Sequence, residues 1–273
     1  MAAPRFLEKF ESDGASISYT FPLGRYEWQS TQPFRSAYRS VVGASYAHDF
    51  YGALPYPKDV GIETVRAILE ASSTANLDTA VDNLKEELVN IGRGKLYTLT
   101  DASVRRWAWA KLLDMPEFRV GVGMGISPHQ PVIIRFARFG DWRHATATED
   151  TQTCDEDPEA FTITNPGNAP VYDAVFTIEA NTAGGFSNLV ITNSTTGYSI
   201  TTTRDSAADT DEIVIDCGKG TFEYNGADDY ATVTLGATQV GFMRLDPGSN
   251  SFSIACDGTP NFDFSWSFSG AYH

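Results

Sequence analysis

The histidines are the first residues to consider for chemistry, and their spacing argues against a metal or catalytic site. His48, His129, His144 and His273 are isolated, and none has a second histidine or a cysteine three or four residues away. Zinc and related metal sites usually use ligand residues that are only a few positions apart in the sequence. We therefore expect no metal and no cofactor.

The acidic and glycine-rich segments give equally little support to an enzyme. Asp155-Glu156-Asp157 and the acids from Asp209 to Glu212 could hold calcium in a loop, but we favour solvated acidic loops. Gly121-Val-Gly-Met-Gly125 is not the dinucleotide fingerprint, and no Gly-x-Ser-x-Gly element is present. A glycosidase needs two carboxylates that meet in space, which a sequence does not display, so that class stays open. The sequence favours a protein that is not an enzyme.

We expect the three cysteines to form neither disulfides nor a zinc site. Cys154, Cys217 and Cys256 are an odd number, widely separated and without short spacings. We interpret them as small reduced hydrophobes rather than disulfide or zinc ligands, as is usual inside cells.

The charge is distributed unevenly along the 273 residues. Up to Thr148 there are 17 Lys and Arg against 16 Asp and Glu, and afterwards 3 against 19. The length fits two domains, and the asymmetry indicates that their surfaces differ. The acidic half should repel nucleic acid at long range.

Nothing in the sequence predicts insertion into a membrane. No run approaches the ~20 apolar residues that a spanning helix needs. The first ten residues also lack the apolar segment of a signal peptide. We expect a soluble protein.

The first domain is predicted over residues 1–144, with a long hairpin arm over residues 35–69. Its tip, around Phe50, Tyr51 and Tyr56, is rich in aromatic residues and proline. Such a tip either folds back onto its own core or contacts a partner, because it is too apolar to leave in water.

One helix is predicted over residues 76–91. A single apolar stripe is formed by Leu77, Val81, Leu84, Leu88 and Ile91 at spacings of three and four. Asn76 is the expected N-cap, and Gly92 followed by Arg93 should end the helix.

The second domain is predicted over residues 161–273, after an acidic linker at 145–160 without periodicity. Short β-rich runs recur there between Gly, Asn and Pro turns. The stretch Glu212-Ile-Val-Ile-Asp216 alternates, as do Phe222 and Tyr224, and Gly218-Lys-Gly220 joins the two runs into a hairpin. These patterns predict an antiparallel β-sandwich.

Several motifs of the second half resemble the C-terminal domain of distal tail proteins of long-tailed phages. They are Asn165-Pro-Gly-Asn-Ala-Pro170, Ile191-Thr-Asn-Ser-Thr-Thr-Gly197, Glu212-Ile-Val-Ile-Asp216, Leu245-Asp-Pro-Gly-Ser-Asn250 and Phe264-Ser-Trp266. The first half is similar too, in its aromatic hairpin and in Gly92-Arg-Gly-Lys-Leu-Tyr97, Arg106-Trp-Ala108, Met115-Pro116 and Asp141-Trp142. The order of these motifs runs from about residue 15 to 273.

The resemblance implies a mainly β virion protein of two domains, built for structure rather than catalysis. The first would be an α+β split barrel or sandwich with one helix, and the second a galectin-like antiparallel β-sandwich. Such proteins form a hexameric ring at the phage tail tip, assembled in the host cytoplasm. The ring joins the tail tube protein to the tail hub or tip protein, and DNA passes through it.

The resemblance also favours an intersubunit role for the arm. We expect Tyr46, Phe50, Tyr51 and Tyr56 to lie at the oligomer interface. One heterologous contact, repeated, closes a ring.

Carbohydrate recognition by the sandwich is the alternative function. Sugar sites use an exposed aromatic ring beside polar groups, and Tyr198 and Tyr230, next to Gly and Asp, are the candidates for contact with a host-surface glycan. Trp266, between Phe264 and Phe268 on one face, is expected in the core instead.

Overall fold

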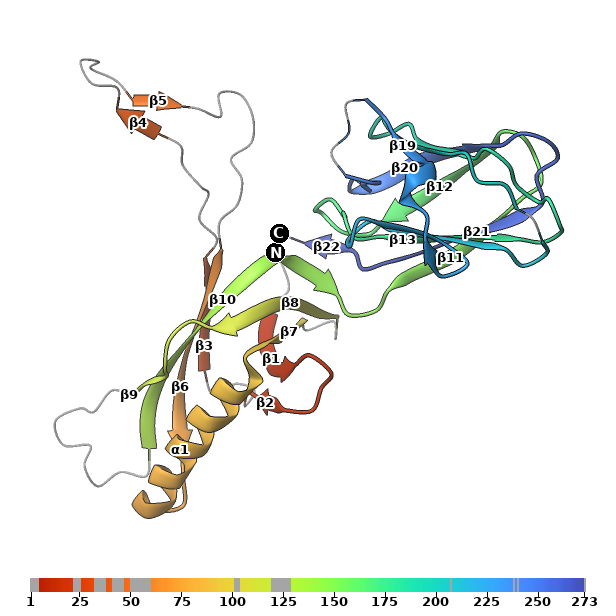
Figure 1. Ribbon diagram of the computed structural model, residues 1–273. Coiled ribbons are helices and arrows are strands. Elements are labelled where there is room, and N and C mark those ends of the chain that lie inside the picture. Colours follow the sequence, from red (N-terminus) through yellow and green to blue (C-terminus); the bar gives the residue numbers. More distant parts are fainter. Residues whose placement is uncertain are drawn as a thin grey trace. The chain divides into compact units, whose positions relative to one another are not determined.

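The computed structural model describes residues 5–21, 26–31, 38–40, 47–49, 60–100, 104–118, 129–206, 208–237, 239 and 241–272. The chain divides into two compact units, Met1–Gly140 and Asp141–His273. The protein is mainly β with one α-helix among these residues, as expected (Figure 1). Within the described ranges, no helix combines the length and apolar character needed to cross a membrane.

The first unit is built on one sheet in the order β2-β1-β7-β8-β10-β6-β3, with the short β9 also paired to β10. Its strands are β1 (Arg5–Ser12), β2 (Ser18–Thr20), β3 (Tyr26–Thr31), β6 (Gly61–Glu70), β7 (Arg93–Thr100), β8 (Arg105–Leu112), β9 (Glu117–Phe118) and β10 (His129–His144). The last four residues of β10 belong to the second unit.

Helix α1 (Thr74–Ile91) lies against β1, β2 and β6. The predicted stripe is confirmed, since Leu77, Leu84, Leu88 and Ile91 are buried. The predicted N-cap is wrong by three residues. Ser73 is the cap, and its hydroxyl accepts from the Asn76 backbone N–H at 3.2 Å.

The end of α1 follows the expectation. Gly92 has φ of 62°, and its N–H donates to the Val89 carbonyl at 3.2 Å. A left-handed residue of this kind commonly ends a helix because glycine has no Cβ to clash. The core beneath the helix includes Phe10 and Phe136, whose ring centroids are 4.8 Å apart.

The predicted pairing of the arm is wrong. Strand β6 pairs with β3 and β10, whereas β4 (Tyr38–Ser40) pairs with β5 (Ala47–Asp49) in a separate two-stranded sheet. The first strand of the predicted hairpin therefore pairs within residues 38–49 and not with residues 61–70. The predicted tip residues Phe50, Tyr51 and Tyr56 lie outside the described residues. Alternation of apolar residues shows that a segment is extended but does not identify its partner.

A buried ion pair joins the strands β3, β6 and β10. Glu63 is 0% exposed and accepts from Arg138 Nε at 2.6 Å. Trp28 Nε1 and the Ser30 hydroxyl donate to the same carboxylate, each at 2.8 Å. Gly61 lies opposite Arg138, and a Cβ there would approach the guanidinium to 3.0 Å. The glycine therefore leaves room for the buried charge.

The second unit contains two packed sheets, ordered β11-β21-β13-β16-β17-β18 and β12-β20-β14-β15-β19. Its strands are β11 (Thr148–Cys154), β12 (Glu159–Asn165), β13 (Val175–Ala180), β14 (Val190–Asn193), β15 (Tyr198–Thr202), β16 (Glu212–Asp216), β17 (Thr221–Tyr224), β18 (Ala227–Asp228), β19 (Val233–Leu235), β20 (Gly248–Ala255), β21 (Phe262–Phe268) and β22 (Ala271–Tyr272). A single-turn 3-10 helix, Tyr230–Thr232, precedes β19. Strand β22 pairs with Trp142 and Arg143.

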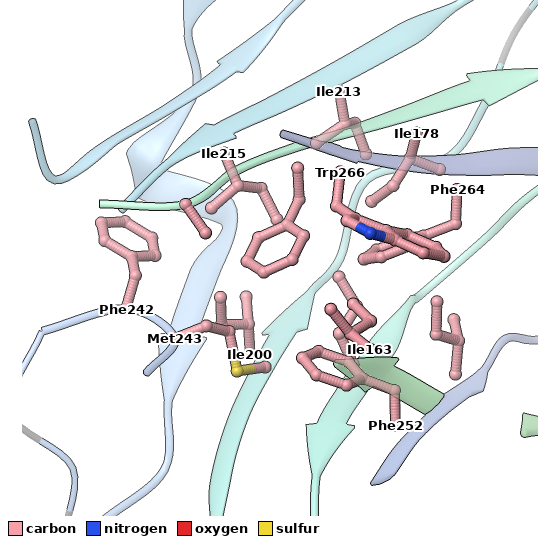
Figure 2. Packing of buried hydrophobic residues seen from close by; sticks show 14 of the residues in the cluster. Ile163, Ile178, Ile200, Ile213, Ile215, Phe242, Met243, Phe252, Phe264 and Trp266 are labelled. Carbon is pink, nitrogen blue, oxygen red and sulfur yellow. The ribbon is translucent and has the colours of Figure 1, made fainter. Parts of the chain in front are cut away.

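The two inner faces meet in an apolar core (Figure 2). Figure 2 shows Ile213 and Ile215 of β16 pointing into it with Phe252 and Trp266 from other strands. The rings of Phe161 and Trp266 stack at 5.7 Å. The predicted alternation of β16 and the core position of Trp266 are confirmed.

The acidic linker predicted over residues 145–160 is instead part of the second unit. Residues Thr148–Cys154 form β11, which pairs along its whole length with β21 at the edge of the six-stranded sheet. Most of its side chains face water and are polar. For this reason its sequence looks like that of a connecting loop. Its backbone hydrogen bonds, which composition does not report, hold it in the sheet.

The cysteines are free thiols. Burial raises the pKa of Cys154 and of Cys217 to about 12, so both stay protonated at neutral pH. These thiols therefore behave as small apolar side chains.

Candidate interaction surfaces

A cation–aromatic face covers one side of β1, β7 and β8. It consists of the outward side chains Lys9, Arg93, Lys95, Tyr97, Trp107, Trp109 and Lys111. The register explains their grouping, because directly paired residues of antiparallel strands share a face. Lys9 is opposite Tyr97 and Tyr97 is opposite Trp107, while Lys95 is opposite Trp109.

The opposite side of these strands carries the core, which fixes the orientation of the face. Leu96, Ala108 and Ala110 are fully buried there. Gly94 faces the same way, and a Cβ on it would come within 2.2 Å of the Glu11 carbonyl oxygen and 2.8 Å of Ile91. Close packing on the inner side therefore forces the charged and aromatic residues outward.

The cations of the face lie over aromatic rings. Arg93 is 4.5 Å from the centroid of Trp109, and Lys95 is 4.9 Å from that of Trp107. The two indoles meet edge to face at 5.5 Å. Attraction of a cation to the electron-rich ring face holds such side chains in place.

Two of the basic residues at the face are already neutralised. Lys9 binds Glu11 at 2.6 Å, and Arg105, at the border, binds Glu8. In contrast, no ion pair among the described residues involves Arg93, Lys95 or Lys111, although Glu11, which binds Lys9, is the register partner of Lys95. The arrangement can present positive charge to an anionic partner, while nothing in it activates a nucleophile.

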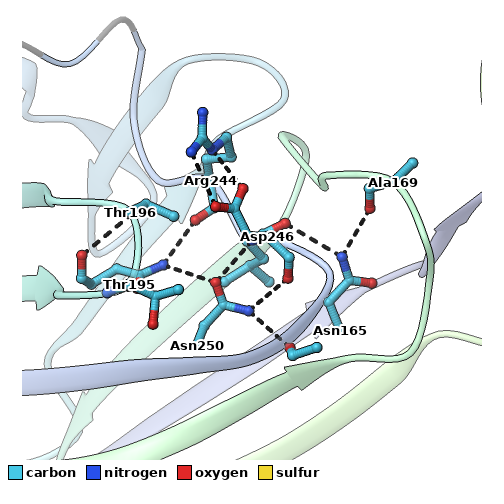
Figure 3. A network of polar contacts seen from close by, with 10 residues as sticks. Asn165, Ala169, Thr195, Thr196, Arg244, Asp246 and Asn250 are labelled. Atoms are coloured by element: carbon cyan, nitrogen blue, oxygen red, sulfur yellow. Dashed lines mark hydrogen bonds and ion pairs between the residues drawn. The ribbon is translucent and has the colours of Figure 1, made fainter.

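A buried asparagine network occupies one end of the five-stranded sheet (Figure 3). Asn165, Asn193 and Asn250 come from the end of β12, the end of β14 and the start of β20, and each is at most 1% exposed. Each lies in one of the motifs on which the resemblance rests. The fold therefore brings three separate motifs into one cluster.

Asn165 joins two backbone segments. Its side-chain amide donates to the carbonyls of Ala169 at 3.0 Å and Leu245 at 3.3 Å, and its oxygen accepts from the Gly167 N–H at 2.9 Å. The turn after β12 is thereby tied to the loop before β20.

Asn193 and Asn250 complete the network around the loop at Arg244 and Asp246. Asn193 donates to the Arg244 carbonyl at 2.9 Å and accepts from the Thr195 N–H at 3.1 Å. Asn250 donates to the Asp246 carbonyl at 2.8 Å and accepts from the Asp246 N–H at 2.9 Å. These buried amides are hydrogen-bonded, as buried polar groups must be, and their role is to fix loops.

The outward side of the six-stranded sheet is acidic, and we call it the acidic sheet face. Its outward carboxylates are Glu149, Glu179, Glu212, Glu223 and Asp263. A hollow of about 410 Å³ opens there, with Glu149, Thr151, Thr177 and Ser265 in its lining. Of the nearby acids, Asp216 is paired, with Lys219 Nζ at 2.9 Å.

The two tyrosines expected to contact glycan differ in their surroundings. Tyr198 packs partly against the core, and the Arg244 guanidinium lies 5.4 Å from its ring centroid. Tyr230 is 47% exposed and meets Phe242 edge to face at 5.8 Å. The expected interface residues Tyr46, Phe50, Tyr51 and Tyr56 lie outside the described residues.

Sequence reasoning missed both the cation–aromatic face and the asparagine network. A signal for the face was present, because Lys95 and Tyr97 alternate with apolar residues, as do Trp107 and Trp109. For the network, the recurring asparagines beside Pro, Gly and Thr turns were the only sign.

Comparison with known proteins identifies related folds. Residues 167–269 match the family model of the siphovirus-type tail component, C-terminal domain. No curated protein sequence matches the chain.

Among solved structures, the chain is similar to the Dit protein (gp 19.1) of phage SPP1, with a TM-score of 0.65 and 10% identity over 97% of this chain and 99% of that one. A chain in the activated baseplate of phage p2 aligns with a TM-score of 0.42 and 9% identity, covering 97% and 98%. The resemblance to distal tail proteins is thereby confirmed.

Proposed function

Because residues 167–269 belong to the siphovirus-type tail component family and the whole chain has the fold of the SPP1 Dit protein, we propose that this phage tail protein forms the ring at the distal end of the tail. In this proposal about six copies close around a channel through which DNA passes. The ring joins the tail tube protein on one side to the hub or tip protein on the other. The protein acts by geometry and carries out no catalytic step.

The single observation that carries the proposal is the family match of the second unit. It falls on the sandwich that contains the asparagine network, and its range includes Asn193 and Asn250. The likeness in fold extends over nearly all of both chains, so the first unit is part of the same architecture. The SPP1 protein is described as a paradigm of the hub adsorption apparatus in phages that infect Gram-positive bacteria.

Several finer features belong to the same proposal. Assembly takes place in the host cytoplasm, and the finished protein resides in the virion at the tail tip. The aromatic residues Tyr46, Phe50, Tyr51 and Tyr56 contact the neighbouring copy, because aromatic side chains are enriched in the cores of interfaces.

The test is the mass of the full chain in solution, measured over a range of concentrations, with negative-stain images of the same sample. We expect a closed ring of about six copies, since one heterologous contact repeated by rotation generates a ring. Tyr51→Ser with Tyr56→Ser should reduce the ring to smaller species without unfolding the protein. A monomer at every concentration would contradict ring formation by this chain alone.

The described residues favour the ring over glycan binding. The Tyr198 ring carries Arg244, which leaves Tyr230, 47% exposed and edge to face with Phe242, as the remaining tyrosine of the two for a sugar contact. Specific binding of the full chain on a glycan array, lost in Tyr230→Ala, would reverse this conclusion.

A further inference from the structure

The cation–aromatic face has a net positive charge that the described part of the first unit does not neutralise. Lys9 and Arg105 are matched by Glu11 and Glu8. Arg93, Lys95 and Lys111 remain, on neighbouring positions of β7 and β8. This concentration of charge stands out, because the first half of the sequence is close to neutral overall.

The cations are preorganised for binding. Lys95 lies 4.9 Å from the centroid of Trp107 and 5.4 Å from that of Trp109, and Arg93 lies 4.5 Å from Trp109. A side chain already held against a ring loses less conformational freedom when it meets a partner. These two held cations, with Lys111 opposite Arg93, therefore suit a partner with carboxylates spaced along strands.

The same geometry argues against recognition of nucleobases. A base-stacking surface needs free aromatic faces. Here Arg93 and Lys95 lie over the indole rings, and the two indoles contact each other edge to face. The overall charge of −15 also opposes the approach of nucleic acid.

The chain itself supplies a complementary surface. On the acidic sheet face, Glu179 and Glu212 are paired residues of β13 and β16, and Glu223 follows on β17. No described cation is paired with these three carboxylates. Nearby, the hollow bordered by Glu149 has room for a long basic side chain.

We infer that the cation–aromatic face of one copy docks on the acidic sheet face of a second copy. The two surfaces differ, so the contact is heterologous, and its repetition closes a ring or extends a filament. This inference rests on the proposed ring and names a contact that would hold it. Carboxylates and guanidinium or ammonium groups across such an interface steer association and fix its register.

The test uses two charge-reversed forms of the full chain. One carries Arg93→Glu with Lys95→Glu, and the other carries Glu179→Lys with Glu212→Lys. Each form alone places like charges across the contact, so we expect self-association to weaken at least about tenfold. Mixed in equal amounts, the two forms should associate again in alternating order, because every junction then joins opposite charges.

Controls separate this contact from a general effect of charge. Asp155→Lys with Asp209→Lys makes the same change in net charge as the acid-reversed form, at exposed loop positions outside the strands of the acidic sheet face, and should leave association unchanged. High salt should weaken the wild-type contact, because at ~1 M the Debye length is about 3 Å. Restored association of the mixture also shows that both reversed forms are folded.

The outcomes distinguish this inference from the proposed function. If the wild type forms rings and the reversed forms do so equally well, or if their mixture fails to recover, the contact is overturned while the ring stands. If the wild type is monomeric throughout, the ring formed by this chain alone fails and the contact fails with it. If Arg93→Glu with Lys95→Glu instead abolishes binding to a short DNA duplex and leaves association intact, the partner is DNA and the inference is wrong.

Discussion

The asparagine network of the second unit and the cation–aromatic face of the first unit treat polar groups in opposite ways. In the network, the buried side chains of Asn165, Asn193 and Asn250 donate to backbone carbonyls of neighbouring loops. On the face, Arg93 and Lys95 rest on indole rings and remain open to solvent. Under the proposed contact, the network stabilises the fold and the face binds a second copy. Substitutions in the network should therefore lower the free energy of unfolding, and substitutions on the face should weaken self-association.

The largest loss of stability should come from a buried charge without its partner. Arg138→Met leaves the Glu63 carboxylate, which is 0% exposed, with only the neutral donors Trp28 and Ser30 among the contacts described above. We expect the free energy of unfolding to fall by about 3–5 kcal/mol, measured by urea denaturation. The matched control, Glu63→Gln with Arg138→Met, should recover much of this. Equal losses in both variants would show that packing, and not the charge, accounts for the effect.

The network should show the next largest effect. Asn193→Ala removes the donor to the Arg244 carbonyl and the acceptor for the Thr195 N–H. Buried groups left unpaired cost about 1–3 kcal/mol each, so we expect a loss of about 2 kcal/mol in the same assay. Ser194→Ala, which removes an exposed hydrogen bond to Ser251, is the control and should change stability little. If Asn193→Ala loses no more stability than Ser194→Ala, the network does not stabilise the fold.

A smaller loss of stability is expected at the N-cap of α1, which is exposed to solvent. Ser73→Ala deletes the hydroxyl that accepts from the Asn76 N–H at the start of α1. The expected loss is about 1 kcal/mol, as for other N-caps. Thermal unfolding should show it, and Ser73→Asp should restore most of the stability. Unchanged stability in Ser73→Ala would mean that water replaces the cap without cost.

The smallest effect on stability belongs to the cation–aromatic face. Lys95→Gln should alter the free energy of unfolding by about 0.5 kcal/mol, because it loses exposed contacts with indole rings and places no like charge opposite Glu11. Its effect on self-association, measured by sedimentation, should be far larger. If the variant loses both stability and association, Lys95 contributes to the fold, and the face does not differ from the network in this respect.

Local patterns in the sequence were sufficient for some elements and not for others. The stripe from Leu77 to Ile91 predicted α1, and the alternation of Ile213 and Ile215 predicted β16, because each pattern depends on the geometry of one element. The arm was mispaired because alternation does not identify a partner strand. Strand β11 was missed because an edge strand with polar side chains shows its pairing only in the backbone.

The candidate surfaces were harder to predict for a related reason. Asn165 and Asn250 lie at the same end of one antiparallel pair, a neighbourhood that only the register of β12 and β20 creates. Trp107 and Lys95 meet because β7 and β8 pair, which puts two local alternations on the same side. The residues were visible in the sequence, and their convergence depended on long-range pairing.

The strand order of the second unit also determines when it can fold during synthesis. Strand β21 lies between β11 and β13, and β20 lies between β12 and β14, although both are made after all of their neighbours. Each sheet therefore stays divided while the ribosome makes most of the unit, and the edges that will receive β20 and β21 stay open. Closure of the sandwich depends on the last strands to emerge, so it is timed by completion of the chain.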